Sequence, residues 1–129
     1  MVHYLTKWIE AEAVATITMA EVRKFIWKNI ITRFDIPRPM IFDNGRQCDT
    51  TKVTNYLSTL GCQARFTVVA HPYTNGQAEV ANKVIVYGLQ KKLDEAKCKC
   101  IDELPGTLWS LGTNKKTAVG ETPFMLAYE

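Results

Sequence analysis

Apolar side chains recur at helical spacing in three stretches of the chain. Residues 18–34 carry one such stripe, and Thr18 with Glu21 has the spacing of a capping box that opens a helix. Residues 50–60 and about 77–97 repeat the pattern, and Gly61 supplies a left-handed exit for the second helix. The residues expected to face the core are Val22, Phe25, Ile26, Ile30, Val53, Tyr56, Leu57, Leu60, Ala78, Ala81, Ile85, Leu89, Leu93 and Ala96.

Three other stretches have the patterns of strands. Residues 4–14 are rich in aromatic and β-branched side chains, 40–42 form a short apolar run, and 62–69 alternate between apolar and other positions. Pro37 and Pro39 end the first helix, and Pro123 starts a short last one. The order strand, helix, strand, helix, strand, helix, helix predicts an α/β layer fold with a mixed sheet.

Composition narrows the class of protein. The 129 residues are enough for about one domain, and 47% hydrophobic with 22% charged residues is ordinary for a globular protein. No apolar run reaches the length of a membrane span and no leader pattern opens the chain, so we expect an intracellular protein without a membrane partner. Its four cysteines lack CxxC spacing, which favours reduced thiols over disulfides or zinc ligands.

The charge pattern gives a weaker indication. The net charge is +3, and five lysines lie between residues 83 and 99 against two acids, Asp94 and Glu95. This lysine run is either an ordinary solvated helix face or a surface for an anionic partner.

Two carboxylates stand at positions where chemistry could occur. Asp43 directly follows the apolar run 40–42, and Glu79 is in the first turn of the long helix. If that helix crosses the end of the strand, the two acids converge on divalent cations, which prefer oxygen ligands. The alternative is structural: Asp43 before Asn44 and Gly45 is a good turn former, and an acid suits a helix N-terminus.

Two motifs carry a family resemblance. DNGRQC at 43–48 and HPYTNGQAEVANK at 71–83, with thirty-five residues between Asp43 and Glu79, resemble the catalytic core of a retroviral-type integrase. The similarity is specifically to gypsy-class LTR retrotransposons of plants, and it extends to residues 6–12, 22–34, 102–110 and 120–129. The resemblance implies a ribonuclease H-like fold, a mixed sheet flanked by helices.

The resemblance also implies a reaction and a site. The reaction is DNA integration by polynucleotidyl transfer, with Mg²⁺ or Mn²⁺ held by Asp43 and Glu79 as catalytic residues. Asn82 and Lys83 would approach DNA, while Asn75, Gly76 and Gln77 belong to a loop beside the site. The implied partners are the element's DNA ends, target DNA and a second copy in a homodimer, and the implied location is the nucleus.

Departures from the family pattern lead us to expect a defective enzyme. The first metal-binding Asp and the first strand of the family lie upstream of the segment that Met1 opens, so we expect both to be missing. His3 stands where relatives carry another Asp, as a bland substitution or as a replacement ligand. We therefore interpret 1–100 as a partial catalytic core and 101–129 as its helical C-terminal extension. We expect no strand transfer by the chain alone.

Two further readings stay open beside a defective enzyme. One is a non-catalytic nucleic-acid-binding remnant that uses the lysine run. The other is a dimerisation remnant that uses the apolar side chains Val80, Val84 and Tyr87.

Overall fold

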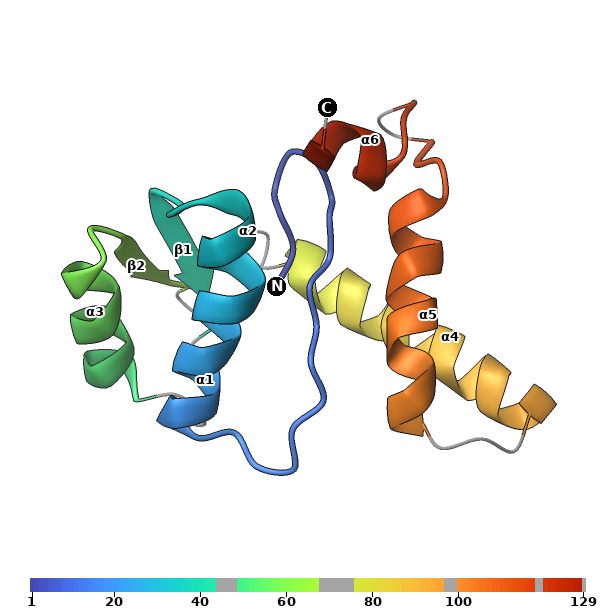
Figure 1. Cartoon of the computed structure of the whole chain (residues 1–129), viewed down its shortest axis with the longest axis horizontal. Helices are drawn as coiled ribbons and strands as arrows, with labels where there is room; N and C mark the ends of the chain where they lie inside the picture. The colour runs from blue at the N-terminus through green and yellow to red at the C-terminus, as the bar shows by residue number, and fades with distance from the viewer. Residues whose placement is uncertain (44–48, 68–75, 97–99, 118–119, 129) are drawn as a thin grey trace. The chain divides into compact units, whose positions relative to one another are not determined.

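The computed structural model describes residues 1–43, 49–67, 76–96, 100–117 and 120–128, with the backbone alone for 92–96 and 100–101. Contacts within the chain divide it into two compact units (Figure 1). Unit 1 comprises Met1–Ala13 and Gln77–Glu129, and unit 2 comprises Val14–Gly76. Each unit is described by itself below.

Unit 2 contains the helices and strands that the hydrophobic pattern predicts. In chain order they are α1 (Met19–Ile26), the π-helical segment η1 (Trp27–Ile31), α2 (Thr32–Phe34), β1 (Pro39–Phe42), α3 (Thr50–Thr59) and β2 (Gln63–Phe66). The strand expected over 62–69 is confirmed for 63–66, and its last two residues lie outside the described part of the chain.

The first helix begins at the predicted cap. Thr18 has extended backbone angles, and its hydroxyl accepts a hydrogen bond from the Glu21 amide at 3.3 Å. The sequence did not indicate the π-helical turn η1, in which the Thr32 amide reaches the carbonyl of Trp27. Ile26 and Ile30, four residues apart, are both buried on the core side, which is the spacing at which helical residues share a face.

The two strands form a parallel pair joined by α3. Met40 lies opposite Ala64 and Phe42 opposite Phe66. Parallel neighbours need a long crossover connection, and α3 is part of it. Gly61 ends the helix with φ of 75°, as predicted, because glycine adopts this left-handed conformation without steric cost.

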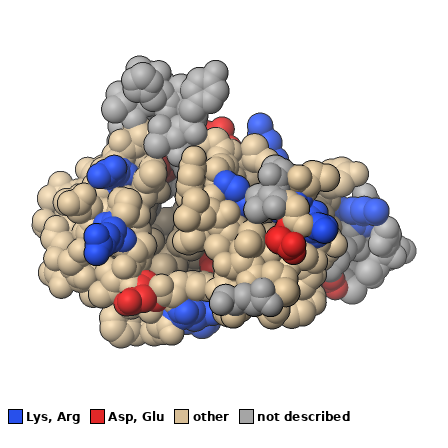
Figure 2. Space-filling view, turned by 90° about the horizontal axis from the view of Figure 1, so that it is seen from above, with Lys and Arg blue, Asp and Glu red and all other residues tan. Residues whose placement is uncertain are grey.

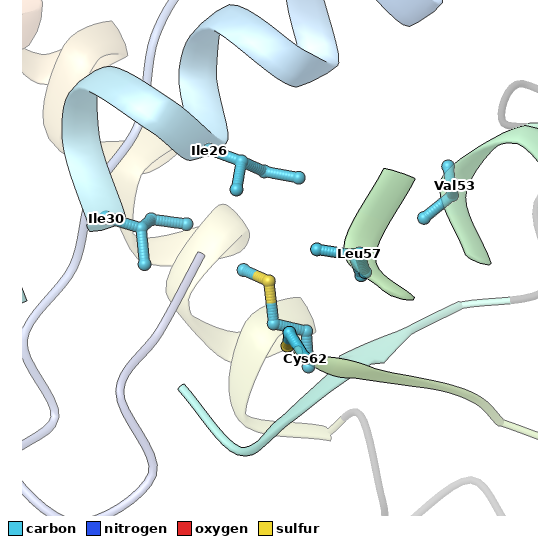
Figure 3. Close-up of a cluster of buried hydrophobic side chains, with 6 residues drawn as sticks. Ile26, Ile30, Val53, Leu57 and Cys62 are labelled. Carbon is cyan, nitrogen blue, oxygen red and sulfur yellow. The ribbon is translucent and has the colours of Figure 1, made fainter. Parts of the chain in front are cut away.

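The core of unit 2 lies between the helices and one face of the sheet. Figure 3 shows side chains from α1, η1 and α3, with Cys62 just before β2, gathered in one cluster. Val53 and Leu57 have at most 1% of their surface exposed, whereas Ile41 and Arg65 on the other sheet face are exposed. The buried members are Ile26, Ile30, Met40, Val53, Leu57 and Cys62.

The N-terminal segment of unit 1 differs from its prediction. Residues 4–14 were expected to form one strand, but a turn at 4–6 reverses the chain, and Val2 pairs with Ile9 in a single antiparallel bridge. Backbone hydrogen bonds join His3 to Trp8 at 2.9 Å, and Lys7 has φ of 60°. A chain that turns back at this point cannot extend as one strand, so the prediction was wrong here.

Three helices make up the rest of unit 1: α4 (Gly76–Ala96), α5 (Cys100–Thr113) and α6 (Pro123–Tyr128). The long helix agrees with its predicted range, and the Met125 amide donates to the Thr122 hydroxyl at 3.2 Å, which confirms the last cap. The stretch 101–129, expected to be a helical C-terminal extension, contains α6 and all of α5 except its first residue, Cys100. Whether they are an extension of a core that ends at residue 100 stays a prediction.

Trp8 is the packing centre of unit 1. Its ring lies edge-on to Tyr128 with centroids 5.3 Å apart, and its indole N–H donates to the buried Glu10 carboxylate at 2.8 Å. A Cβ at Gly112 would come within 2.7 Å of the same ring. Glycine at this position therefore lets α5 approach the indole closely.

Candidate functional site

Asp43 stands where β1 ends. The backbone pairing continues to that point, because the Thr67 amide donates to the Phe42 carbonyl at 2.9 Å. The rings of Phe42 and Phe66 stack with centroids 5.6 Å apart and fix the two strand ends side by side. Asp43 is exposed at the carboxyl end of a parallel strand, which is the edge where ligands gather in open α/β sheets.

Glu79 lies in the first turn of α4 and is also exposed. Of the predicted inward stripe, Ala81 and Ile85 are buried and Ala78 and Leu89 are half-buried, and the side chains of Leu93 and Ala96 lie outside the described part. The predicted outward face is exposed throughout, and its members are Glu79, Asn82, Lys83, Val86 and Gln90. One face of α4 therefore presents an acid, an amide and a cation together.

The residues expected to form the neighbouring loop are only partly described. Asn75 lies outside the described residues, and Gly76 opens α4. Gln77 is half-buried, and its side-chain oxygen is buried without a hydrogen-bond partner in the part of the chain that the structure describes. Such an acceptor is costly to leave unpaired, so Gln77 is suited to meet a donor from outside the described residues.

Asp43 belongs to unit 2 and Glu79 to unit 1, so the distance between their carboxylates stays a prediction. Their oxygen ligands are of the kind that Mg²⁺ and Mn²⁺ prefer. However, the described residues contain no group of three His, Cys, Asp or Glu side chains that could hold a metal ion. The donor chemistry of the two carboxylates suits a divalent cation.

His3 has a structural partner in the turn. Its Nδ1 accepts hydrogen bonds from the Thr6 amide at 3.2 Å and, with the hydroxyl as donor, from Thr6 Oγ1 at 2.8 Å. Because Nδ1 accepts these hydrogen bonds, a neutral ring carries its proton on Nε2, which then has no lone pair for a metal. The contacts therefore favour His3 as a structural substitution over a replacement ligand.

The cysteine prediction is tested at one position. Cys62 is a free thiol with 3% of its surface exposed, packed in the core of unit 2. Burial raises the pKa of this thiol, and a hydrogen bond with the Met40 backbone only partly opposes that rise. Cys62 is therefore a free core thiol whose protonated form is favoured by burial.

A basic group on α1 and η1 was missed by the sequence reasoning, which considered only the lysine run of α4. Arg23, Lys24 and Lys28 are all exposed. Unit 2 contains eight basic residues (Lys and Arg) and four acidic residues (Asp and Glu). Unit 1 contains eight basic residues and nine acidic residues. Figure 2 shows basic side chains in small separate groups on the face displayed. Counting charge by segment would have found this concentration.

Comparison with known proteins shows the fold. No protein-family model and no curated protein matches the sequence. The catalytic core of human T-lymphotropic virus 2 integrase, solved with magnesium in a trimeric form, matches with a TM-score of 0.81 and 16% identity, over 98% of this chain and 81% of the viral one. The bovine immunodeficiency virus integrase core matches with a TM-score of 0.77 and 20% identity, with the same two coverages.

A larger assembly contains the same fold. The simian T-cell lymphotropic virus intasome, solved with the PP2A regulatory subunit B56γ, matches with a TM-score of 0.88 and 18% identity. The match covers 99% of this chain and 46% of the viral chain. The chain thus has the ribonuclease H-like fold of retroviral integrase catalytic cores, as the motifs predicted.

Proposed function

We propose that this chain forms part of the catalytic core of a retroelement integrase of the gypsy class, whose reaction joins element DNA ends to target DNA in the nucleus. The observation that carries the proposal is the placement of two exposed acids in a chain with the integrase-core fold. Asp43 follows β1, and Glu79 lies in the first turn of α4, with thirty-five residues between them.

Asp43 and Glu79 are the residues that would hold Mg²⁺ or Mn²⁺. A related viral core was solved with magnesium, and carboxylate oxygens are the ligands that this ion prefers. When bound, such an ion acts as a Lewis acid toward a phosphodiester. Because the proposed ligand set consists of two carboxylates, we expect weak metal binding and no completed strand transfer by these 129 residues alone.

DNA would meet the outward face of α4. Lys83 would supply a cation for a phosphate and Asn82 an amide for a sugar or base. Gln77 and Asn75 are further proposed contacts from the start of α4 and the residue before it, and Asn75 lies outside the described residues. The affinity of non-specific contacts of this kind depends strongly on salt concentration. A substitution of Lys83 should therefore change the salt dependence of the DNA affinity measurably.

The first experiment measures DNA affinity against salt for the chain and for Lys83→Glu, with Lys115→Glu as a control for the same charge change at an exposed site in unit 1. We expect Lys83→Glu to weaken binding and to flatten the salt dependence by about one unit of slope. If Lys83→Glu and Lys115→Glu bind DNA with equal affinity, the proposed contact between α4 and DNA is wrong.

A joining assay tests the expected inactivity. Labelled DNA ends are incubated with the chain and Mg²⁺ or Mn²⁺, and Asp43→Asn serves as the comparison. We expect no joined product from either protein. Product that forms with the original chain and disappears with Asp43→Asn would show that the site is complete, and that our expectation of a defective enzyme is wrong.

Self-association is a second proposed property, favoured by an exposed apolar stripe on α4. Val80, Val84 and Tyr87 repeat at helical spacing and are 61%, 39% and 69% exposed. One viral core of this fold, that of the human T-lymphotropic virus 2 integrase, was solved in both a dimeric and a trimeric form. We expect concentration-dependent dimerisation in sedimentation experiments, reduced by Tyr87→Glu and retained by Val86→Glu. A chain that stays monomeric at high concentration would contradict this proposal.

A further inference from the structure

A row of polar side chains lies on one face of β2, beside the strand end that carries Asp43. Successive side chains of a strand point to opposite faces, so Gln63, Arg65 and Thr67 share one face of the sheet. The parallel register of β1 and β2 (Figure 1) places Arg65 opposite Ile41, and Asp43 follows Ile41 by two residues on the same face. Arg65 and Asp43 are therefore diagonal neighbours, with Cα atoms about 8 Å apart at ordinary strand spacing.

The core of unit 2 lies on the other face of the two strands. Met40, Phe42, Ala64 and Phe66 alternate with the polar row and pack into or against the buried cluster. Arg65 is exposed on the opposite face. Its guanidinium is therefore available to a ligand that reaches the carboxyl end of β1, which is where ligands gather in open α/β sheets.

Arg65 differs from two other arginines of unit 2 in its surroundings. Arg23 lies over the ring of Tyr56 at 5.2 Å, and Arg33 lies over the ring of Phe34 at 5.4 Å. Within the described residues, the structure gives the Arg65 side chain no such ring contact, ion pair or hydrogen bond. An exposed guanidinium keeps its planar set of N–H donors for an oxygen anion, and this geometry matches phosphate in a bidentate manner.

The row offers donors of the kinds that bind nucleic-acid backbones. The guanidinium of Arg65, the amide of Gln63 and the hydroxyl of Thr67 all belong to the groups that donate to phosphate oxygens. The acid at the end of β1 repels a phosphodiester, because both are negatively charged. A cation on the neighbouring strand offsets that repulsion and so lets a phosphate approach Asp43.

Resting on the function proposed above, which brings DNA to the integrase site, we propose that Arg65 positions the substrate by holding a DNA phosphate beside Asp43. Gln63 and Thr67 are the supporting donors on the same face of β2. The DNA contacts proposed above lie on α4 and at the residue before it, whereas this row lies on a strand of unit 2. Charge complementarity selects an anionic backbone as the occupant of this face.

A salt titration tests the charge of Arg65. The affinity of the chain for a short fluorescent duplex is measured by anisotropy at several salt concentrations. We expect Arg65→Gln to lower the slope of log affinity against log salt by about 0.9, the contribution of one phosphate contact. Arg65→Lys keeps the cation and should keep the slope. Arg38→Gln is the matched control, because Arg38 is exposed directly before β1 and alternates with the row's face.

A scan with neutral phosphates locates the contact on the DNA. Single methylphosphonate groups, each of which removes one phosphate charge, are placed in turn near the 3′ end of the duplex. We expect one position to weaken binding by the original chain. Arg65→Gln should bind that duplex and the unmodified duplex equally, because both changes remove the same contact and their effects are not additive.

A second cycle places the contact beside Asp43. In metal-free buffer, Asp43→Asn should tighten binding of the unmodified duplex, because it removes a negative charge near the held phosphate. The gain should shrink in the double variant with Arg65→Gln, which no longer holds that phosphate. Additive effects of these two substitutions would overturn the proposed position of the phosphate.

Two further results would overturn the proposal, once circular dichroism shows that the variants are folded. They are equal salt slopes for Arg65→Gln and Arg38→Gln, and a methylphosphonate scan whose effects in Arg65→Gln match those in the original chain at every position. The contact of α4 is judged separately by Lys83→Glu against Lys115→Glu. Either comparison can fail while the other succeeds, so failure of the Arg65 contact is distinguishable from failure of the proposed function.

Discussion

The two units of this chain bury their apolar side chains in different ways. Unit 2 is one continuous segment whose core is mainly aliphatic, with Val53 and Leu57 almost fully buried. Unit 1 joins two segments that are far apart in sequence, and aromatic rings around Trp8 hold them together while Trp109 and Tyr128 stay 59% and 47% exposed. A local aliphatic core is readable from periodicity, whereas an aromatic contact between distant segments is not.

The largest expected effect in unit 1 comes from Trp8→Ala. The substitution removes the ring contacts with Phe124 and Tyr128 and leaves the buried Glu10 carboxylate without its indole donor. We expect a loss of about 3–5 kcal/mol in the free energy of unfolding. Denaturant titration followed by near-ultraviolet circular dichroism measures it. A loss below about 1 kcal/mol would show that Trp8 is not the packing centre of unit 1.

Leu57→Ala is the corresponding change in unit 2. Its side chain is 1% exposed and lies among Ile26, Ile30 and Cys62, so truncation leaves a cavity. The expected loss is about 2–5 kcal/mol. The thiol of Cys62 provides a local readout, because opening of this core makes it react faster with a thiol reagent. Ser58→Ala, at an exposed neighbouring position, is the control.

Gly112→Ala tests the close approach of α5 to Trp8 and should have a smaller effect. The new methyl would lie 2.7 Å from the indole, so the helix or the ring must shift. Overpacking of this kind costs about 1–3 kcal/mol, although alanine is the better helix former. Gly76→Ala meets no atom within 4 Å and serves as the matched control. Thermal midpoints that rise in Gly112→Ala would contradict the contact.

The smallest expected effect concerns the cap of α3 and depends on pH. The Asp49 carboxylate accepts from the amides of Thr51 at 3.1 Å and Lys52 at 3.2 Å. The hydrogen bond from the Lys52 backbone, helped by the charge of that lysine, lowers the pKa of Asp49 below its usual 3.8. The folded pKa is thus below the unfolded one. The stabilisation is present above about pH 3.8 and is lost as pH falls through the lower folded value.

Asp49→Asn separates the charge from the cap. Asparagine caps helices about as well as aspartate but does not titrate, so the variant should lose less stability than the original chain on acidification. The measurement is the thermal midpoint at several pH values between neutral and acid. Identical pH profiles for the two proteins would show that the charge on Asp49 contributes nothing to stability.

The sequence reasoning succeeded where one local pattern decides the structure. Thr18, Thr122 and Gly61 mark helix ends through chemistry that acts within a few residues, and all three have the predicted roles. It failed at residues 4–14, where aromatic and β-branched residues indicated one strand. The same residue types suit both arms of a turn, and the positive φ of Lys7 leaves no signal in composition.

The candidate site also has features that the sequence predicted and features that it did not predict. The local environment of each acid was predictable, because Asp43 follows an apolar run and Glu79 lies on the outer face of an amphipathic helix. The π-helical turn and the exposed position of Trp27 were not predictable, because the pattern 18–34 is compatible with a regular α-helix. Only side-chain exposure distinguishes a tryptophan in the core from one that faces solvent.

By itself, the sequence determined helices α1, α3, α4 and α6, the two strands of unit 2 and the two acidic positions, since hydrophobic periodicity and capping act over short distances along the chain. The tertiary structure decided which distant segments share a core, as with Trp8, Gly112 and Tyr128, and which side chains stay exposed. The physical reason is that burial depends on contacts between residues far apart in sequence, and such contacts leave no periodic trace in either partner.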